Sequence, residues 1–96
     1  IHVGDKYMAD IYGANKQGII TIKSNEGAHK DETIENVINK EGRNDAAFKE
    51  LIKPDYTIDN IRQLPALMEM IESGYHSLKE KKSHQIAQAT GFKLYN

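Results

Sequence analysis

The chain has 96 residues, of which 39% are hydrophobic and 28% are charged, a composition typical of one small globular domain. The formal net charge of -1 provides no positive field that would attract nucleic acid, and the lack of cysteine excludes disulfides and thiolate chemistry. No apolar run approaches the roughly 18–20 residues of a membrane span, and no basic-then-apolar signal pattern opens the sequence. We therefore expect a cytoplasmic protein that binds neither nucleic acid nor membranes.

Two short β-prone runs flank an amphipathic segment near the amino terminus. The first run is Ile1–Val3 and the second is Ile19–Ile22. Between them, Tyr7–Gln17 carries apolar side chains at three-to-four spacing, and Gly18 stands where a helix would end. A continuous β-branched run such as the second one is typical of a parallel strand that is covered on both faces. The pattern predicts two adjacent parallel strands joined by this helix.

A polar insert at 24–52 follows the second predicted strand. It begins as a loop and continues into a helix with a narrow apolar stripe, for which Asp31 offers an amino-terminal charge and Gly42 an end. Asn44 is predicted to cap a short second helix, which Pro54 prevents from continuing. This insert is longer than the usual connection between such strands.

A third β-prone run at 56–58 precedes the last predicted core helix. Asp59 is placed to cap the turn after this run, and Pro65 suits the first turn of the helix. The following segment, 75–96, is rich in Lys, His and Gln and has no strong apolar face. We predict one domain at 1–74 and a polar tail that is helical or frayed.

Two carboxylates stand where the first predicted strand meets the helix. Asp5 follows the strand directly, and Asp10 falls in the first helical turn. Because helical side chains lean toward the amino terminus of their helix, Asp10 should point back toward Asp5. Ligands of open α/β sheets bind outside the carboxyl ends of the strands, and Mg²⁺ prefers oxygen ligands. The arrangement favours a divalent-metal phosphate site, although acidic residues at helix starts are also common for structural reasons.

Two stretches of the sequence, in this order, carry a resemblance to a known enzyme family. The first comprises Val3-Gly4-Asp5, Asp10-Ile11-Tyr12-Gly13-Ala14, Gly18-Ile19 and Thr21. The second comprises Lys53-Pro54-Asp55-Tyr56-Thr57-Ile58 and Leu64-Pro65. The first resembles the fourth motif of the haloacid dehalogenase-type (HAD) hydrolases with its following helix and strand, and the second resembles the last core strand and the closing helix of the same family.

The resemblance implies an α/β fold, in which a Rossmann-like parallel sheet with flanking helices forms the carboxyl-terminal half of a HAD core. It also implies that Asp5 binds magnesium directly and that Asp10 and Gly4 support the metal site. Lys6, where family members often have a small polar residue, is a candidate phosphate contact or a solvated surface lysine. The implied activity of the parent protein is magnesium-dependent hydrolysis of a small phosphorylated metabolite.

Family members also need a nucleophilic Asp and a general-acid Asp in a DxD motif, a Ser or Thr, and a Lys, and none of these precedes Ile1. We therefore expect an inactive fragment that associates with itself or pairs with a missing amino-terminal half. Two alternatives stay open: a non-catalytic metal-binding or protein-interaction module, and an assembly in which another polypeptide supplies the nucleophile.

The remaining charged groups are interpreted as surface features. The run at 79–82 contains three lysines, and such a run is typical of a solvated helix face. No two histidines have the i,i+3 or i,i+4 spacing of a helical metal site. The four histidines are His2, His29, His76 and His84.

Overall fold

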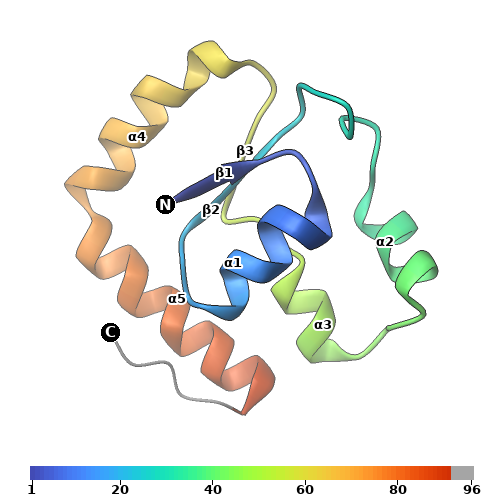
Figure 1. The fold of residues 1–96 in the computed structure, drawn as a ribbon. Helices are drawn as coiled ribbons and strands as arrows, with labels where there is room; N and C mark the ends of the chain where they lie inside the picture. Colours follow the sequence, from blue (N-terminus) through green and yellow to red (C-terminus); the bar gives the residue numbers. More distant parts are fainter. Residues whose placement is uncertain (92–96) are drawn as a thin grey trace.

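The computed structural model describes residues 1–91, which form an α/β fold with helices on both faces of a three-stranded parallel sheet (Figure 1). β1 (His2–Gly4) pairs with β2 (Thr21–Ser24), which also pairs with β3 (Tyr56–Ile58). The register places Val3 beside Ile22. Because the strands are parallel and follow the order β1-β2-β3, all three end at one edge of the sheet, and β1 is an outer strand. The prediction that the first two runs form adjacent parallel strands is confirmed.

The connection between β1 and β2 is helical, as predicted, but it begins as a π-helix. η1 (Tyr7–Tyr12) has this wider winding and continues into α1 (Gly13–Lys16). Gly18, with a φ of 74°, follows the helical segment where the sequence predicts its end. β2 begins two residues later than the predicted run, because the first two isoleucines of that run belong to the connection.

One face of the sheet is covered by α4 (Leu64–Ser73) and α5 (Tyr75–Thr90), as Figure 1 shows. The predicted polar tail is therefore a regular helix as far as residue 90, while 92–96 lie outside the described residues. Within residues 1–91, no helix combines the length and the apolar content that crossing a membrane requires. The core on this face consists of Ile20, Ile22, Ile58 and Ile71.

The opposite face of the sheet carries η1, and the insert packs against the outer side of η1 as α2 (Ile34–Glu41) and α3 (Ala46–Leu51). Val37, Phe48 and Ile52 form a second core there, together with aromatic and aliphatic side chains of η1. The ring centroids of Tyr12 and Phe48 are 5.4 Å apart in a tilted pair. The insert thus has an apolar interior of its own.

Two predicted helix caps are each displaced by one residue. Asp45 rather than Asn44 caps α3, and α2, for which Asp31 was predicted only as an amino-terminal charge, is capped by Thr33. Asn60 rather than Asp59 caps η2 (Ile61–Gln63), the short 3-10 turn before α4. An N-cap side chain must reach a backbone N–H two or three residues ahead, so the residue that precedes the first helical turn takes the role. The three observed cap distances are 3.1 Å to Asn36 N, 3.1 Å to Phe48 N and 2.8 Å to Arg62 N.

Candidate functional site

The carboxyl edge of the sheet is polar. Asp5, Asn25 and Asp59 are the residues that directly follow β1, β2 and β3. The loops after β2 and β3 are joined there, since the Asn25 backbone N–H donates to Ile58 O at 2.9 Å and the Asn25 amide donates to Asp59 Oδ1 at 2.9 Å. We refer to this region as the carboxyl edge.

Asp10 folds back onto the end of β1. Its Oδ2 accepts from the Lys6 backbone N–H at 3.0 Å, and its Oδ1 lies 3.3 Å from Nε2 of His2. Burial alone would raise the pKa of Asp10, but the Lys6 N–H and the His2 imidazole outweigh it and lower the pKa below its usual value. A Cβ on Gly4 would lie 2.2 Å from Cγ of Asp10. Glycine is therefore required at position 4 for Asp10 to take this position.

Asp5 is approached by the loop that follows β2. Its Oδ2 lies 3.4 Å from the His29 backbone nitrogen, which donates in a long contact. Gly27 has a φ of 108°, and a Cβ there would lie 2.7 Å from the same Asp5 oxygen. The loop comes this close because residue 27 has no side chain. Since Asp5 makes only this weak contact among the hydrogen bonds within residues 1–91, its carboxylate keeps free capacity to bind a ligand.

The carboxyl edge provides a small set of candidate metal ligands. Within the described part of the chain, no group of three or more His, Asp or Glu side chains is arranged to hold a metal ion. Mg²⁺ is commonly bound through one or two carboxylates, with water and substrate phosphate completing the shell. The donor chemistry of Asp5 fits such a site. The side chain of Lys6 is exposed beside it, while the Lys6 backbone holds Asp10.

A buried lysine at this edge was not predicted from the sequence. Lys23 of β2 is 1% exposed, and its Nζ donates to Ser24 O at 3.1 Å and to Asn25 Oδ1 at 3.4 Å. The ammonium lies 5.0 Å from the centroid of the Tyr7 ring. Burial raises the pKa of the Tyr7 hydroxyl, and the negative charge of Glu32 adds to this shift. The sequence signal was a lysine directly after a β-branched run.

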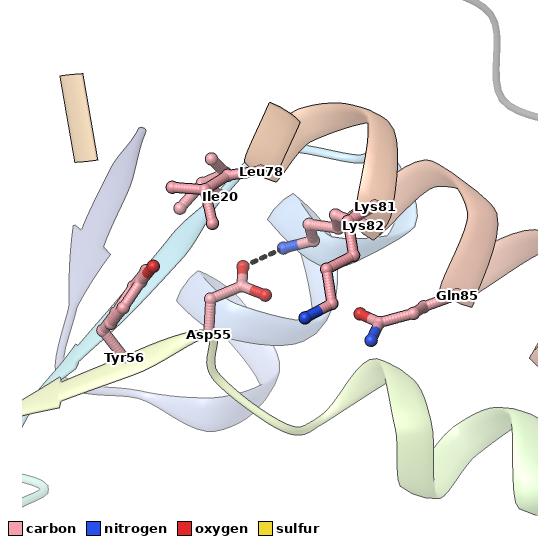
Figure 2. Close-up of a pocket in the computed structure, with 7 residues that line it drawn as sticks. All are labelled: Ile20, Asp55, Tyr56, Leu78, Lys81, Lys82 and Gln85. Atoms are coloured by element: carbon pink, nitrogen blue, oxygen red, sulfur yellow. Dashed lines mark hydrogen bonds and ion pairs between the residues drawn. The ribbon is translucent and has the colours of Figure 1, made fainter. Parts of the chain in front are cut away.

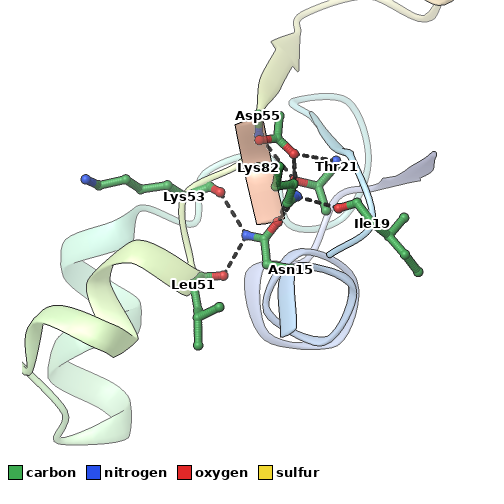
Figure 3. A network of polar contacts seen from close by, with 7 residues as sticks. All are labelled: Asn15, Ile19, Thr21, Leu51, Lys53, Asp55 and Lys82. Atoms are coloured by element: carbon green, nitrogen blue, oxygen red, sulfur yellow. Dashed lines mark hydrogen bonds and ion pairs between the residues drawn. The ribbon is translucent and has the colours of Figure 1, made fainter. Parts of the chain in front are cut away.

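The opposite, amino edge of the sheet holds a saturated polar network, which Figure 3 shows. The Asn15 amide donates to Leu51 O at 2.7 Å and to Lys53 O at 2.8 Å, and its Oδ1 accepts from Thr21 Oγ1 and Lys82 Nζ. An asparagine side chain has two donor hydrogens and two acceptor lone pairs, so every one of them is used. We call Asn15, Thr21, Asp55 and Lys82 the amino-edge network.

The run at 79–82 was predicted to be a solvated helix face, and this prediction is wrong for Lys82. Although it lies on α5, it is 5% exposed, and its Nζ donates to Asn15 Oδ1, Ile19 O and Asp55 Oδ2. Burial lowers the pKa of Lys82, and the Asp55 carboxylate opposes part of that shift. The three acceptors match the three protons of an ammonium group. Lys82 therefore attaches α5 to the sheet.

A cavity of about 200 Å³ lies beside this network (Figure 2). Asp55 and Tyr56 at the start of β3 form one side, and Leu78, Lys82 and other residues of α5 form the other. This cavity is at the edge opposite Asp5 and Asp10. Asp55 and Lys82 of its lining already pair with each other in the amino-edge network. Because ligands of open α/β sheets bind outside the carboxyl ends of the strands, we assign the candidate site to the carboxyl edge.

Two of the four histidines lie near the acidic residues of the candidate site. His2 contacts Asp10, and the backbone of His29 contacts Asp5, whereas His76 and His84 are exposed on α5.

No model of a protein family, no curated protein and no solved structure matches this chain. Function therefore has to be inferred from the motif and from the geometry of the carboxyl edge.

Proposed function

We propose that this chain is part of a magnesium-dependent HAD-type phosphohydrolase that acts on a small phosphorylated metabolite. In this proposal the chain supplies the acidic metal-binding motif, and another segment or polypeptide supplies the nucleophilic aspartate. Asp5 is the direct metal ligand, Asp10 and Gly4 shape the turn that presents it, and Lys6 is a candidate phosphate contact. Magnesium bound there would offset the negative charge of the phosphate.

The observation that carries the proposal is the packing of the Asp10 side chain against Gly4, directly beside Asp5 in the chain. The glycine leaves room for Asp10, and Asp10 accepts a hydrogen bond from the backbone N–H of Lys6. This fixes the turn between β1 and η1, so that the Asp5 side chain stands at the carboxyl end of a parallel strand. Ligands of α/β sheets bind at that end.

Metal binding at Asp5 tests the first half of the proposal. We expect Mn²⁺, added to the 96-residue chain as a paramagnetic substitute for Mg²⁺, to broaden the backbone amide signals of residues 4–10 and 25–29. Asp5→Asn removes a charged oxygen ligand and should abolish this broadening. Glu72→Gln is the matched control, because Glu72 is an exposed acidic residue of α4 on the other face of the sheet. Equal broadening in all three proteins would contradict the assignment of Asp5.

A phosphatase assay tests whether the chain needs a nucleophile from another segment or polypeptide. Since an aspartyl-phosphate intermediate needs the attacking carboxylate, the isolated chain is expected to release no phosphate from a generic phosphate ester in the presence of magnesium. Turnover that disappears in Asp5→Asn would show that the chain provides its own chemistry. A DxD motif after an apolar strand in the reading frame upstream of Ile1 would support the enzyme parent.

One observation favours the alternative of a non-catalytic interaction module. Both carboxylate oxygens of Asp10 are engaged, one by His2 and one by the Lys6 N–H, as in a purely structural turn. Under this alternative, Asp5→Asn and Asp10→Asn would change stability without changing metal binding. The Mn²⁺ experiment therefore separates the two functions.

A further inference from the structure

Lys23 is a buried charge that the fold does not neutralise directly. Its side chain is directed to the η1 face of the sheet and is 1% exposed. Both hydrogen-bond acceptors of its ammonium are neutral groups, the carbonyl of Ser24 and the amide oxygen of Asn25. Within residues 1–91, no carboxylate forms an ion pair with Lys23. Asp59 is connected to it indirectly, through the Asn25 amide.

Lys82 shows what a structural buried lysine looks like in the same protein. Its ammonium forms an ion pair with Asp55 and has three acceptors for its three protons. Burial of an ammonium group is costly unless the charge is paired and hydrogen-bonded. A buried lysine that lacks a carboxylate partner is therefore better explained by an anionic ligand than by stability. Features that do not favour stability, such as a buried charge without a partner of opposite charge, are expected at functional sites.

The position of Lys23 relates it to the carboxyl edge. In the sheet register Lys23 is the partner of Gly4, the residue before Asp5. Its Nζ contacts Ser24 and Asn25, which lie toward the carboxyl end of β2. The ring over the ammonium belongs to Tyr7, the first residue of the π-helical η1. π-helical turns occur frequently at functional sites.

We propose that Lys23 is an oxyanion-binding residue of the carboxyl edge and that it contacts the phosphate group of the ligand when the Tyr7 ring turns aside. This inference rests on the proposed function, to which it adds the residue that recognises the negative charge of the substrate. Asp5 would hold the metal and Lys23 would hold phosphate oxygens from the β2 side. The ligand class is a phosphate-bearing anion.

Titration of the 96-residue chain with inorganic phosphate, without metal and at constant ionic strength, tests this role by NMR. Lys23→Met removes the ammonium and keeps an unbranched apolar side chain, so we expect the Kd for phosphate to rise by about ten- to hundredfold. Lys23→Arg keeps the charge and should restore most of the affinity. Lys40→Met removes one exposed lysine of α2 and controls for net charge. In the wild-type chain the Tyr7 ring signals should shift as phosphate binds.

Thermal unfolding of the same variants distinguishes binding from a structural role. Because Lys23 lacks a carboxylate partner, we expect Lys23→Met to be at least as stable as the wild-type chain. Equal phosphate affinity in the wild-type chain and Lys23→Met would overturn the inference, and so would undetectable phosphate binding by the wild-type chain. Since the titration contains no metal, failure of the Lys23 inference leaves the Mn²⁺ test of Asp5 unaffected, and the reverse also holds.

Discussion

At the scale of single residues, the two glycines that contact the acidic motif have a steric explanation. Position 4 carries glycine because the Asp10 side chain occupies the space of a Cβ, and position 27 carries glycine because Asp5 does so there. Each carboxylate of the motif is thus matched by a residue without a side chain. Gly4 is the last residue of β1 and Gly27 lies in the loop after β2, so the contact of Gly27 with Asp5 ties that loop to the end of β1.

We expect Gly4→Ala to destabilise the protein by about 1–3 kcal/mol, because the new methyl group overlaps Asp10. Gly13→Ala is the matched control, since Gly13 has helical φ and ψ and no atom lies within 4 Å of a Cβ there. This control should stabilise the protein by about 0.4–1 kcal/mol by restricting the unfolded chain. Urea unfolding of both variants measures the difference. A Gly4→Ala protein as stable as Gly13→Ala would refute the steric explanation.

Asp10 should also influence acid unfolding. Its pKa in the folded protein is below 3.8, so the folded state binds this proton less readily than the unfolded state. The stability that Asp10 contributes is fully present above pH 3.8 and is lost as the pH falls through the lowered pKa. Asp10→Asn removes the titrating group, so its unfolding free energy should fall less steeply than that of the wild-type chain below pH 3.8. Parallel acid curves for the two proteins would exclude this contribution.

The places of Asp5 and Asp10 in the fold could be predicted from the sequence, but the burial of two lysines could not. Asp5 follows β1 and Asp10 lies in the first turn of η1, as the strand-to-helix pattern predicts. Lys82 is buried by Asn15 and Asp55, which are 67 and 27 residues away in the sequence. Such partners become visible only when the fold has brought them together.

At the scale of elements, α5 is attached by a buried polar contact and by a few apolar ones. Lys82 and Ile86 are its buried side chains, and Tyr75 and Leu78 pack against the core of the sheet, while most of the helix surface is hydrophilic. Sequence periodicity detects an apolar stripe, and α5 has none of useful width, so a frayed helix was a reasonable alternative. The π-helical start of η1 was missed for a related reason, because three-to-four apolar spacing does not separate α from π winding.

Lys82→Met should loosen α5. The variant leaves the Asp55 carboxylate, Asn15 Oδ1 and Ile19 O without their shared donor, and we expect a loss of about 3 kcal/mol in unfolding free energy. Lys81→Met is the matched control, because Lys81 is the exposed neighbour on the same helix and should change stability by less than about 0.5 kcal/mol. Faster amide hydrogen exchange across 75–90 in Lys82→Met would locate the effect. Equal exchange in both variants would show that α5 is held by other contacts.

At the scale of the whole molecule, the sheet has an unprotected outer strand. β1 pairs with β2 on one side, and no other strand among residues 1–91 pairs with it. Ile1 is 37% exposed next to this strand. Unpaired strand groups beside apolar side chains favour association between sheet edges.

We expect the chain to associate as its concentration rises, with β1 at the interface. Sedimentation velocity over a range of concentrations measures the association, and Ile1→Lys should weaken it because a charged residue at a strand edge opposes pairing. Lys40→Met, which changes the net charge on α2, should have no comparable effect. A monomer at every concentration would contradict the exposed-edge argument.

The amino-edge network has a consequence for engineering of the chain. Every donor and acceptor of Asn15 is in use, so the amino-edge network joins helical, strand and loop segments at that edge of the sheet. The loops at the carboxyl edge take no part in these hydrogen bonds. The exposed positions Ala28, Lys30 and Asp31 of the loop after β2 are therefore suitable for substitution, because the sheet retains its anchor when these side chains are exchanged. A library of substitutions at these three positions should retain the fold while the surroundings of Asp5 are varied.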